Sequence, residues 1–206
     1  MTRSYWVFGY GSLIWKPPPH AVEKRSGYVK GVVRRFAQSS IDHRGTPEDP
    51  GRVVTVIEAK EWHALAGSNP DPTDEDFVWG VAYRIDPVKE DEVRAYLEHR
   101  EKNGYTSHDV HVYSMDENER EVIAVEDATI WIGKLDNPAF VGYEHPHNLA
   151  ATIVHRHGPS GPNKDYLYKL AESVRELYPH VRDDYLFDLE ARVKALDPAP
   201  EITSDA

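Results

Sequence analysis

The decisive stretch of the chain is Trp6-Val7-Phe8-Gly9-Tyr10-Gly11-Ser12-Leu13-Ile14-Trp15, an apolar run that two glycines interrupt around a tyrosine. A strand that opens into such a loop leaves several backbone N–H groups pointing in one direction, with no Cβ atom to block access. Converging N–H groups suit a small anionic group. We therefore expect residues 9–13 to form an anion-binding loop.

Two other interpretations of this loop stay open. A dinucleotide-binding turn needs Gly-x-Gly-x-x-Gly at the start of a helix, and Ile14 stands where the third glycine should be, which disfavours a Rossmann fold. The glycines could also form a tight bend within a sheet that binds nothing.

The bulk composition indicates one globular domain. The chain has 206 residues, 40% hydrophobic and 11% aromatic, which is enough for one well-buried core and short for two. We expect a single domain over residues 1–197 and a disordered Pro-, Ser- and Asp-rich tail over residues 198–206. No window approaches about 18 unbroken apolar residues and the start does not resemble a signal peptide, so the expected location is cytoplasmic.

Charge and residue usage narrow the classes of partner. The net charge of −11 repels polyanions, so we expect neither nucleic acid nor an anionic membrane as a partner, and a small anionic substrate needs local arginines. Zero cysteines exclude disulfides, thiolate metal sites and a cysteine nucleophile. The pairs His145/His147 and His155/His157 lack the His-x-x-x-His spacing of a helical metal site, so we expect these histidines to be solvated or structural and expect no metal site.

The pattern of the first two thirds of the chain favours strands. Five segments are rich in β-branched and aromatic residues or alternate in polarity, and these are residues 27–38, 52–58, 77–85, 107–113 and 122–133. Residues 39–51 carry turn formers and are expected to be a loop. Residues 60–76 are polar and acidic, which predicts an exposed excursion that tolerates cutting.

Helices follow the strands. Asp86-Pro87 is a helix start, and Asn103-Gly104 is a typical helix stop. Three helices are expected later: one that contains Leu149, Ile153 and Val154 and ends at Gly158, one capped by Asn163, and one that carries Leu186, Leu189, Val193 and Leu196. Strands followed by helices predict an α+β fold, in which a mostly antiparallel sheet curls towards a small barrel with helices on its flank.

A glutamate lies on the buried side of the first helix. Val93, Tyr96 and Leu97 form its apolar stripe, and the same stripe continues to Arg100 and Glu101. Burial and the negative end of the helix dipole would both raise the pKa of Glu101 into the range of ~6–7 that suits a general acid–base. The alternatives are a structural ion pair with an arginine or a frayed helix end.

Many ordered motifs together carry a family resemblance. Beyond the glycine loop they are Arg34-Arg35-Phe36, Asp42-His43-Arg44-Gly45, Pro50-Gly51-Arg52-Val53, Trp79-Gly80-Val81-Ala82-Tyr83-Arg84, Arg100-Glu101-Lys102-Asn103-Gly104-Tyr105, Asp136-Asn137-Pro138 and Gly158-Pro159-Ser160-Gly161. With these motifs, the chain resembles the ChaC family of glutathione-specific γ-glutamylcyclotransferases, in a fungal-like form. It departs from the family at Ala37, where relatives usually carry tryptophan, and in its longer segment 60–76.

The resemblance implies a small barrel-like fold with flanking helices and an intramolecular reaction. The α-amino group of a γ-glutamyl unit attacks its own γ-carbonyl, which closes 5-oxoproline and releases Cys-Gly without water, metal or cofactor. The catalytic glutamate of the family matches Glu101. The substrate-binding residues expected on this basis, from the loop and elsewhere, are Val7, Phe8, Gly9, Tyr10, Gly11, Ser12, Leu13, Arg35, Arg52 and Tyr166.

For Arg35, Arg52 and Tyr166 both a substrate-binding and a structural role stay open. Arg35 and Arg52 would hold the remaining negative charge of glutathione, and Tyr166 would supply a hydroxyl, but a surface or structural role fits each of them equally well. Tyr105 would line the pocket.

Two rival functions stay open: cyclotransfer on other γ-glutamyl amino acids or amines, and a non-catalytic protein that binds a γ-glutamyl ligand.

Overall fold

The structure is a computed structural model that describes residues 4–67, 76–100, 105–177 and 181–197. Five strands close into a barrel, in the order β1 (Trp6–Gly9), β5 (Phe77–Ile85), β2 (Ala21–Lys30), β6 (Tyr105–Met115) and β7 (Glu121–Gly133). Neighbouring strands are antiparallel except β1 and β7, which pair in parallel at Val7 and Thr129. The predicted α+β fold with a mostly antiparallel, barrel-like sheet is confirmed.

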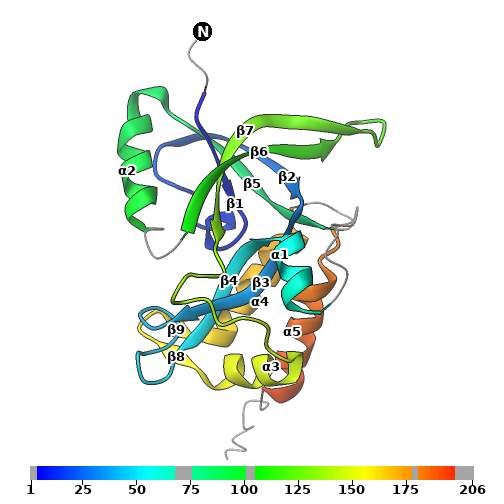
Figure 1. The fold of residues 1–206 in the computed structure, drawn as a ribbon. Coiled ribbons are helices and arrows are strands. Elements are labelled where there is room, and N and C mark those ends of the chain that lie inside the picture. Colours follow the sequence, from blue (N-terminus) through cyan, green and yellow to red (C-terminus); the bar gives the residue numbers. More distant parts are fainter. Residues whose placement is uncertain (1–3, 68–75, 101–104, 178–180, 198–206) are drawn as a thin grey trace, which may run out of the picture.

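A second layer lies below the barrel in Figure 1. Strands β3 (Val32–Ser40) and β4 (Gly51–Glu58) form an antiparallel pair, and α3 (Pro146–His155), α4 (Asn163–Arg175) and α5 (Asp184–Leu196) pack with it. Helix α2 (Glu90–Arg100) lies beside the barrel. The short elements are η1 (Ser12–Ile14), α1 (Ala59–Leu65), η2 (Pro87–Lys89), β8 (His157–Gly158) and β9 (Gly161–Pro162).

The glycine loop lies where two apolar clusters meet. One cluster fills the barrel and includes Phe8 and Ile130, and the other lies between β3–β4 and the helices and includes Phe36 and Leu167. The half-buried ring of Tyr10 packs against both clusters. The loop is therefore held by both halves of the molecule.

Strand β5 matches its predicted bounds, 77–85, and is buried more completely than its alternation suggests. Trp79 and Tyr83 are buried as expected, but Val78 and Ala82 on the other face are equally buried, at 1% and 0% exposure. Both faces are covered because Val78 and Ala82 pack inside the barrel, whereas Ile85 on the other face packs in the cluster that contains residues of α2.

The predicted strand over residues 27–38 is wrong, because it is two strands. Gly31 has φ of +75°, in the left-handed region that glycine adopts most readily, and it separates β2 from β3. Strand β2 pairs with β5 in the barrel, whereas β3 pairs with β4 in the second sheet. This single glycine therefore carries the chain from one half of the molecule to the other.

The segment 60–76 is not exposed throughout. Its first part belongs to α1, which buries Trp62 to 7% exposure, and Asp76 at its end is equally buried and contacts His63 at 2.9 Å. The sequence-based prediction failed because one tryptophan can anchor an otherwise polar helix. Residues 68–75 lie outside the described residues.

The helix starts are only partly as predicted. The carboxylate of Asp86 accepts a hydrogen bond from the Val88 N–H at 3.0 Å, as expected of a cap, and the first turn is the 3-10 helix η2. In α2, Val93 and Leu97 are fully buried, but Tyr96 is 48% exposed, so the buried stripe is narrower than predicted. Helix α3 ends at His155 rather than at Gly158, where the short strand β8 follows.

Two further predictions concern residues that the structure does not describe. The predicted helix stop at Asn103-Gly104 and the tail 198–206 lie outside the described residues. Within the described residues, no helix has the length and apolar character needed to cross a membrane.

Candidate active site

The glycine loop is a tight connection between β1 and η1. The Ile14 N–H donates to the Gly11 carbonyl at 3.0 Å, which begins the short helix. A Cβ atom at Gly9 would lie 2.5 Å from the Cβ of Leu13, so the turn closes only with glycine at this position. In the described part of the chain, the N–H of Gly11 donates to no internal acceptor, which leaves it available to an anion.

Helix α4 brings a hydroxyl group to this loop. A Cβ atom at Gly11 would lie 3.3 Å from the Tyr166 hydroxyl and 2.8 Å from Cγ1 of Val54. The Tyr166 ring is 8% exposed and makes edge contacts with Trp15 and Phe36. The structure therefore places together the glycine loop and the one tyrosine that the sequence suggested as a hydroxyl donor.

The side chain of Arg34 holds the glycine loop in place, a role that the sequence-based prediction did not assign to it. Its guanidinium donates to the carbonyl oxygens of Tyr10 and Trp79 and lies 2.8 Å from a carboxylate oxygen of Asp183. Burial lowers the pKa of Arg34, and Asp183 opposes that effect. An alternating strand puts one arginine of an Arg-Arg pair on the inner face, but the sequence could not show which one.

Two residues expected to bind substrate have their side chains in the core. Val7 and Phe8 are 0% and 1% exposed, and they belong to different apolar clusters on opposite faces of β1. Their side chains therefore cannot contact a ligand. Leu13 is also buried, so its side chain shapes the loop from beneath, whereas Tyr10 and Ser12 are partly exposed.

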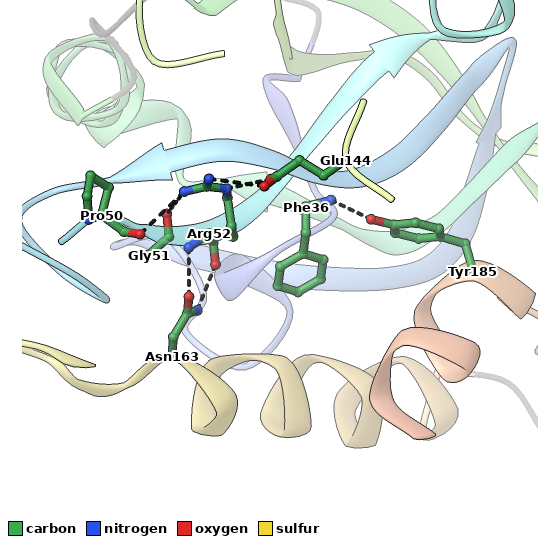
Figure 2. A network of polar contacts seen from close by, with 7 residues as sticks. All are labelled: Phe36, Pro50, Gly51, Arg52, Glu144, Asn163 and Tyr185. Carbon is green, nitrogen blue, oxygen red and sulfur yellow. Dashed lines mark hydrogen bonds and ion pairs between the residues drawn. The ribbon is translucent and has the colours of Figure 1, made fainter. Parts of the chain in front are cut away.

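Arg52 is engaged in a structural network rather than at the glycine loop. Its Nε lies 2.6 Å and its Nη2 3.2 Å from the two carboxylate oxygens of Glu144. Figure 2 shows this guanidinium turned to Glu144, while the amide of Asn163 contacts the backbone of the same residue. The charge of Arg52 is thus paired with that of Glu144, and its role in holding a substrate charge stays a prediction.

Arg35 lies in a different environment from the loop. Its guanidinium is stacked 5.0 Å from the Trp62 ring centre and 4.4 Å from that of Tyr185, and Nη1 donates to the Arg34 carbonyl at 2.6 Å. Burial lowers the pKa of Arg35 and raises that of Tyr185 to about 12. The Tyr185 hydroxyl accepts a hydrogen bond from the Phe36 N–H at 3.0 Å (Figure 2).

A cavity of about 160 Å³ opens beside Arg35 and is lined by Trp62, Tyr143 and Leu189 among others. No residue of the glycine loop lines it. The structure therefore places Arg35 at this cavity and not at the glycine loop, and its role in holding a negative charge of the substrate stays a prediction.

Glu101 lies outside the described residues, but its flanks are described. Leu97, four residues before it, is fully buried, and Tyr105, four residues after it, is partly buried. Both pack in the cluster that contains Leu13, the last residue of the glycine loop.

The described residues contain no group of side chains that could bind a metal ion. Across residues 4–67, 76–100, 105–177 and 181–197, no three His, Asp or Glu side chains come together in a way that could hold a metal ion. The arrangement at the loop offers a main-chain N–H group and a phenol, which are suited to binding a carboxylate.

Comparison with known proteins finds relatives in sequence and in fold. The family described as ChaC-like protein matches residues 5–196. A glutathione-specific gamma-glutamylcyclotransferase of Schizosaccharomyces pombe is 43% identical over 93% of this chain and 93% of its own, and one of Saccharomyces cerevisiae is 40% identical over 84% and 86%. The crystal structure of a glutathione-specific gamma-glutamyl cyclotransferase from yeast has a TM-score of 0.80 and 36% identity, and covers 95% of this chain and 100% of its own.

Proposed function

The chain belongs to the ChaC-like family, and from that premise we propose that it is a glutathione-specific γ-glutamylcyclotransferase. It converts glutathione into 5-oxoproline and Cys-Gly. Three relatives of that name are 37–43% identical over most of the chain. The structural observation that carries the proposal is the position of the Tyr166 hydroxyl beside Gly11, at a loop held by both halves of the fold.

The reaction forms one carbon–nitrogen bond and breaks another. The substrate α-amino nitrogen, after losing a proton, attacks the γ-carbonyl carbon, and the amide nitrogen of cysteine departs after it gains a proton. Attacker and target belong to one molecule, so the protein accelerates the reaction mainly by holding the folded conformer. No water molecule is consumed.

The N–H groups of residues 9–13 bind the α-carboxylate or the developing oxyanion in this proposal. Gly11 is suited to this role because its N–H has no internal acceptor in the described chain, and Tyr166 adds a hydroxyl at the same place. The rigid support of Arg34 under Tyr10 keeps the loop in one conformation before the substrate arrives.

We propose Glu101 as the general acid–base. It would take a proton from the substrate ammonium and deliver one to the departing nitrogen, a contribution of ~10²–10⁴ in rate. Leu97 and Tyr105 support this role, because both lie against the cluster of Leu13. That cluster brings the chain on either side of Glu101 close to the glycine loop.

The proposal extends to organisation and location. We propose one domain over residues 1–197 in a cytoplasmic protein, since zero cysteines exclude the disulfides with which small secreted domains are stabilised. The net charge of −11 supports a small-molecule substrate over nucleic acid or an anionic membrane. Cell fractionation tests the location, and enrichment in a membrane or secreted fraction would contradict it.

A substrate panel tests the function. Purified protein is incubated separately with glutathione, γ-glutamyl-alanine and a γ-glutamylamine, and 5-oxoproline is measured by mass spectrometry. We expect 5-oxoproline from glutathione alone. Activity on γ-glutamyl-alanine without activity on glutathione would overturn the specificity, and binding of glutathione without any product would favour a non-catalytic binder.

A further inference from the structure

An arginine that the reaction scheme leaves unused lies next to Tyr166. The Arg44 guanidinium carbon is 5.7 Å from the centre of the Tyr166 ring, and Nη1 donates to the Pro162 carbonyl at 3.1 Å. In the part of the chain that the structure describes, this guanidinium contacts no carboxylate, unlike Arg52 with Glu144. It therefore carries an uncompensated positive charge beside the candidate active site.

The backbone holds Arg44 in place. Its N–H donates to the Ser40 hydroxyl at 3.0 Å. A Cβ atom at the next residue, Gly45, would lie 2.6 Å from the Ser40 carbonyl oxygen and 2.7 Å from that of Asp49, so the loop packs tightly there. The loop is also tied to the segment before α4, because the Ser160 N–H donates to the His43 carbonyl at 2.9 Å. The side chain thus starts from a fixed position.

Arg44 lies close enough to the glycine loop for one tripeptide to contact both. The Tyr166 hydroxyl lies 3.3 Å from the position of a Cβ at Gly11, and the guanidinium lies 5.7 Å from the centre of the same ring. Those contacts place the guanidinium within about 12 Å of the loop, and three extended residues span roughly 10–11 Å, slightly more with a γ-linkage. A glutathione with its γ-glutamyl end at the loop reaches Arg44 with its other end.

We propose that Arg44 binds the glycine carboxylate of glutathione and thereby sets the preference for glutathione over other γ-glutamyl compounds. This inference rests on the proposed function. It assigns to Arg44 the charge-binding role that the sequence suggested for Arg35 and Arg52. Arg35 is stacked between two rings away from the loop, and Arg52 is paired with Glu144. In a chain of net charge −11, an anionic group needs such a local cation.

A cycle of protein and substrate changes tests the proposal. We compare wild type with Arg44→Gln on glutathione and on glutathione whose glycine carboxylate is replaced by a carboxamide, and we measure kcat and KM from 5-oxoproline formation. Arg120→Gln is the matched control, because it removes one positive charge from the exposed turn between β6 and β7. Thermal unfolding of each variant checks that it is folded, and Arg44→Lys tests whether charge alone restores binding.

We expect wild type and Arg120→Gln to prefer glutathione over its carboxamide by about 10- to 100-fold in kcat/KM, mainly through KM, because a charge-assisted hydrogen bond is lost. Arg44→Gln should treat the two substrates alike, within about threefold, and Arg44→Lys should recover part of the preference. If Arg44→Gln keeps the wild-type preference, the inference is wrong while the proposed function stands. If wild type forms no 5-oxoproline from either compound, both are wrong.

Discussion

The side-chain amide of Asn163 bridges both backbone groups of Arg52. Its Oδ1 accepts from the Arg52 N–H at 2.6 Å, and its Nδ2 donates to the Arg52 carbonyl at 2.7 Å (Figure 2). Asn163 was predicted to cap α4, but Pro162 occupies the cap position and Asn163 is the first helical residue. The bridge ties α4 to β4, and so it sets the position of Tyr166 relative to the glycine loop.

Replacing Asn163 with alanine should therefore lower both stability and activity. The change leaves two partly buried backbone groups of Arg52 without partners, which costs about 1–3 kcal/mol of unfolding free energy. Urea unfolding measures this loss, and kcat/KM for glutathione should fall as Tyr166 shifts. Asn118→Ala, on an exposed turn, is the control and should stay within about 0.5 kcal/mol of wild type. An Asn163→Ala protein as stable as wild type would refute the structural role of the bridge.

A methyl group at Gly11 should reduce activity. Its Cβ would lie 2.8 Å from Cγ1 of Val54 and 3.3 Å from the Tyr166 hydroxyl, so the loop must move away from α4. A displacement of about 1 Å at a reacting centre lowers the rate by about 10²-fold. We expect this fall in kcat/KM for Gly11→Ala, measured by 5-oxoproline formation.

Relief of the steric clash provides the control for that prediction. Adding Val54→Ala to Gly11→Ala removes the Cγ1 atom in the way, and it should restore activity at least about tenfold over the single variant. Wild-type kinetics for Gly11→Ala would mean that the close approach to Val54 and Tyr166 does not matter for turnover.

Stability should fall in acid partly through Glu190. Burial raises the pKa of this side chain, but hydrogen bonds from Arg175 and Lys194 outweigh burial and hold the pKa below its ordinary value of 4.5. Since the folded pKa lies below the unfolded one, the unfolded state takes up the proton first. The stabilisation is therefore complete above about pH 4.5 and is lost as the pH falls through the folded pKa.

Urea unfolding of wild type and Glu190→Gln between pH 7 and pH 3 checks this behaviour. At pH 7 the variant should be less stable by about 1 kcal/mol, a modest value because both cationic partners are half exposed to solvent. The difference should shrink towards zero at pH 3. If the difference in stability between wild type and Glu190→Gln grew as the pH falls, the pKa of Glu190 would be raised in the folded state and not lowered, which would contradict this account.

Local patterns predicted much of the fold. The alternation over residues 77–85 placed β5 with its bounds, and the Asp86-Pro87 pair placed the start of the helix, because each signal depends only on neighbours in sequence. The break at Gly31 escaped prediction since the residues on both sides have the same strand-forming composition. Nothing local marked the change from one sheet to the other.

The site was less predictable because its contacts are long-range. The glycine loop and Tyr166 could be proposed from the sequence, and the structure brings them together. The partners of the arginines could not be proposed, because Asp183 and Glu144 come from segments distant in sequence from Arg34 and Arg52. Which arginine is free to bind a substrate therefore emerges only when the chain is folded.

Product analysis of Glu101→Gln against wild type tests the central claim most directly. Both proteins and the control Glu98→Gln, which changes an exposed residue of α2, are incubated with glutathione, and 5-oxoproline, Cys-Gly and glutamate are quantified by mass spectrometry. We expect wild type and Glu98→Gln to form 5-oxoproline and Cys-Gly in equal amounts without glutamate, and folded Glu101→Gln to be slower by ~10²–10⁴. Near-normal turnover by Glu101→Gln, or glutamate in place of 5-oxoproline, would contradict cyclisation by this glutamate.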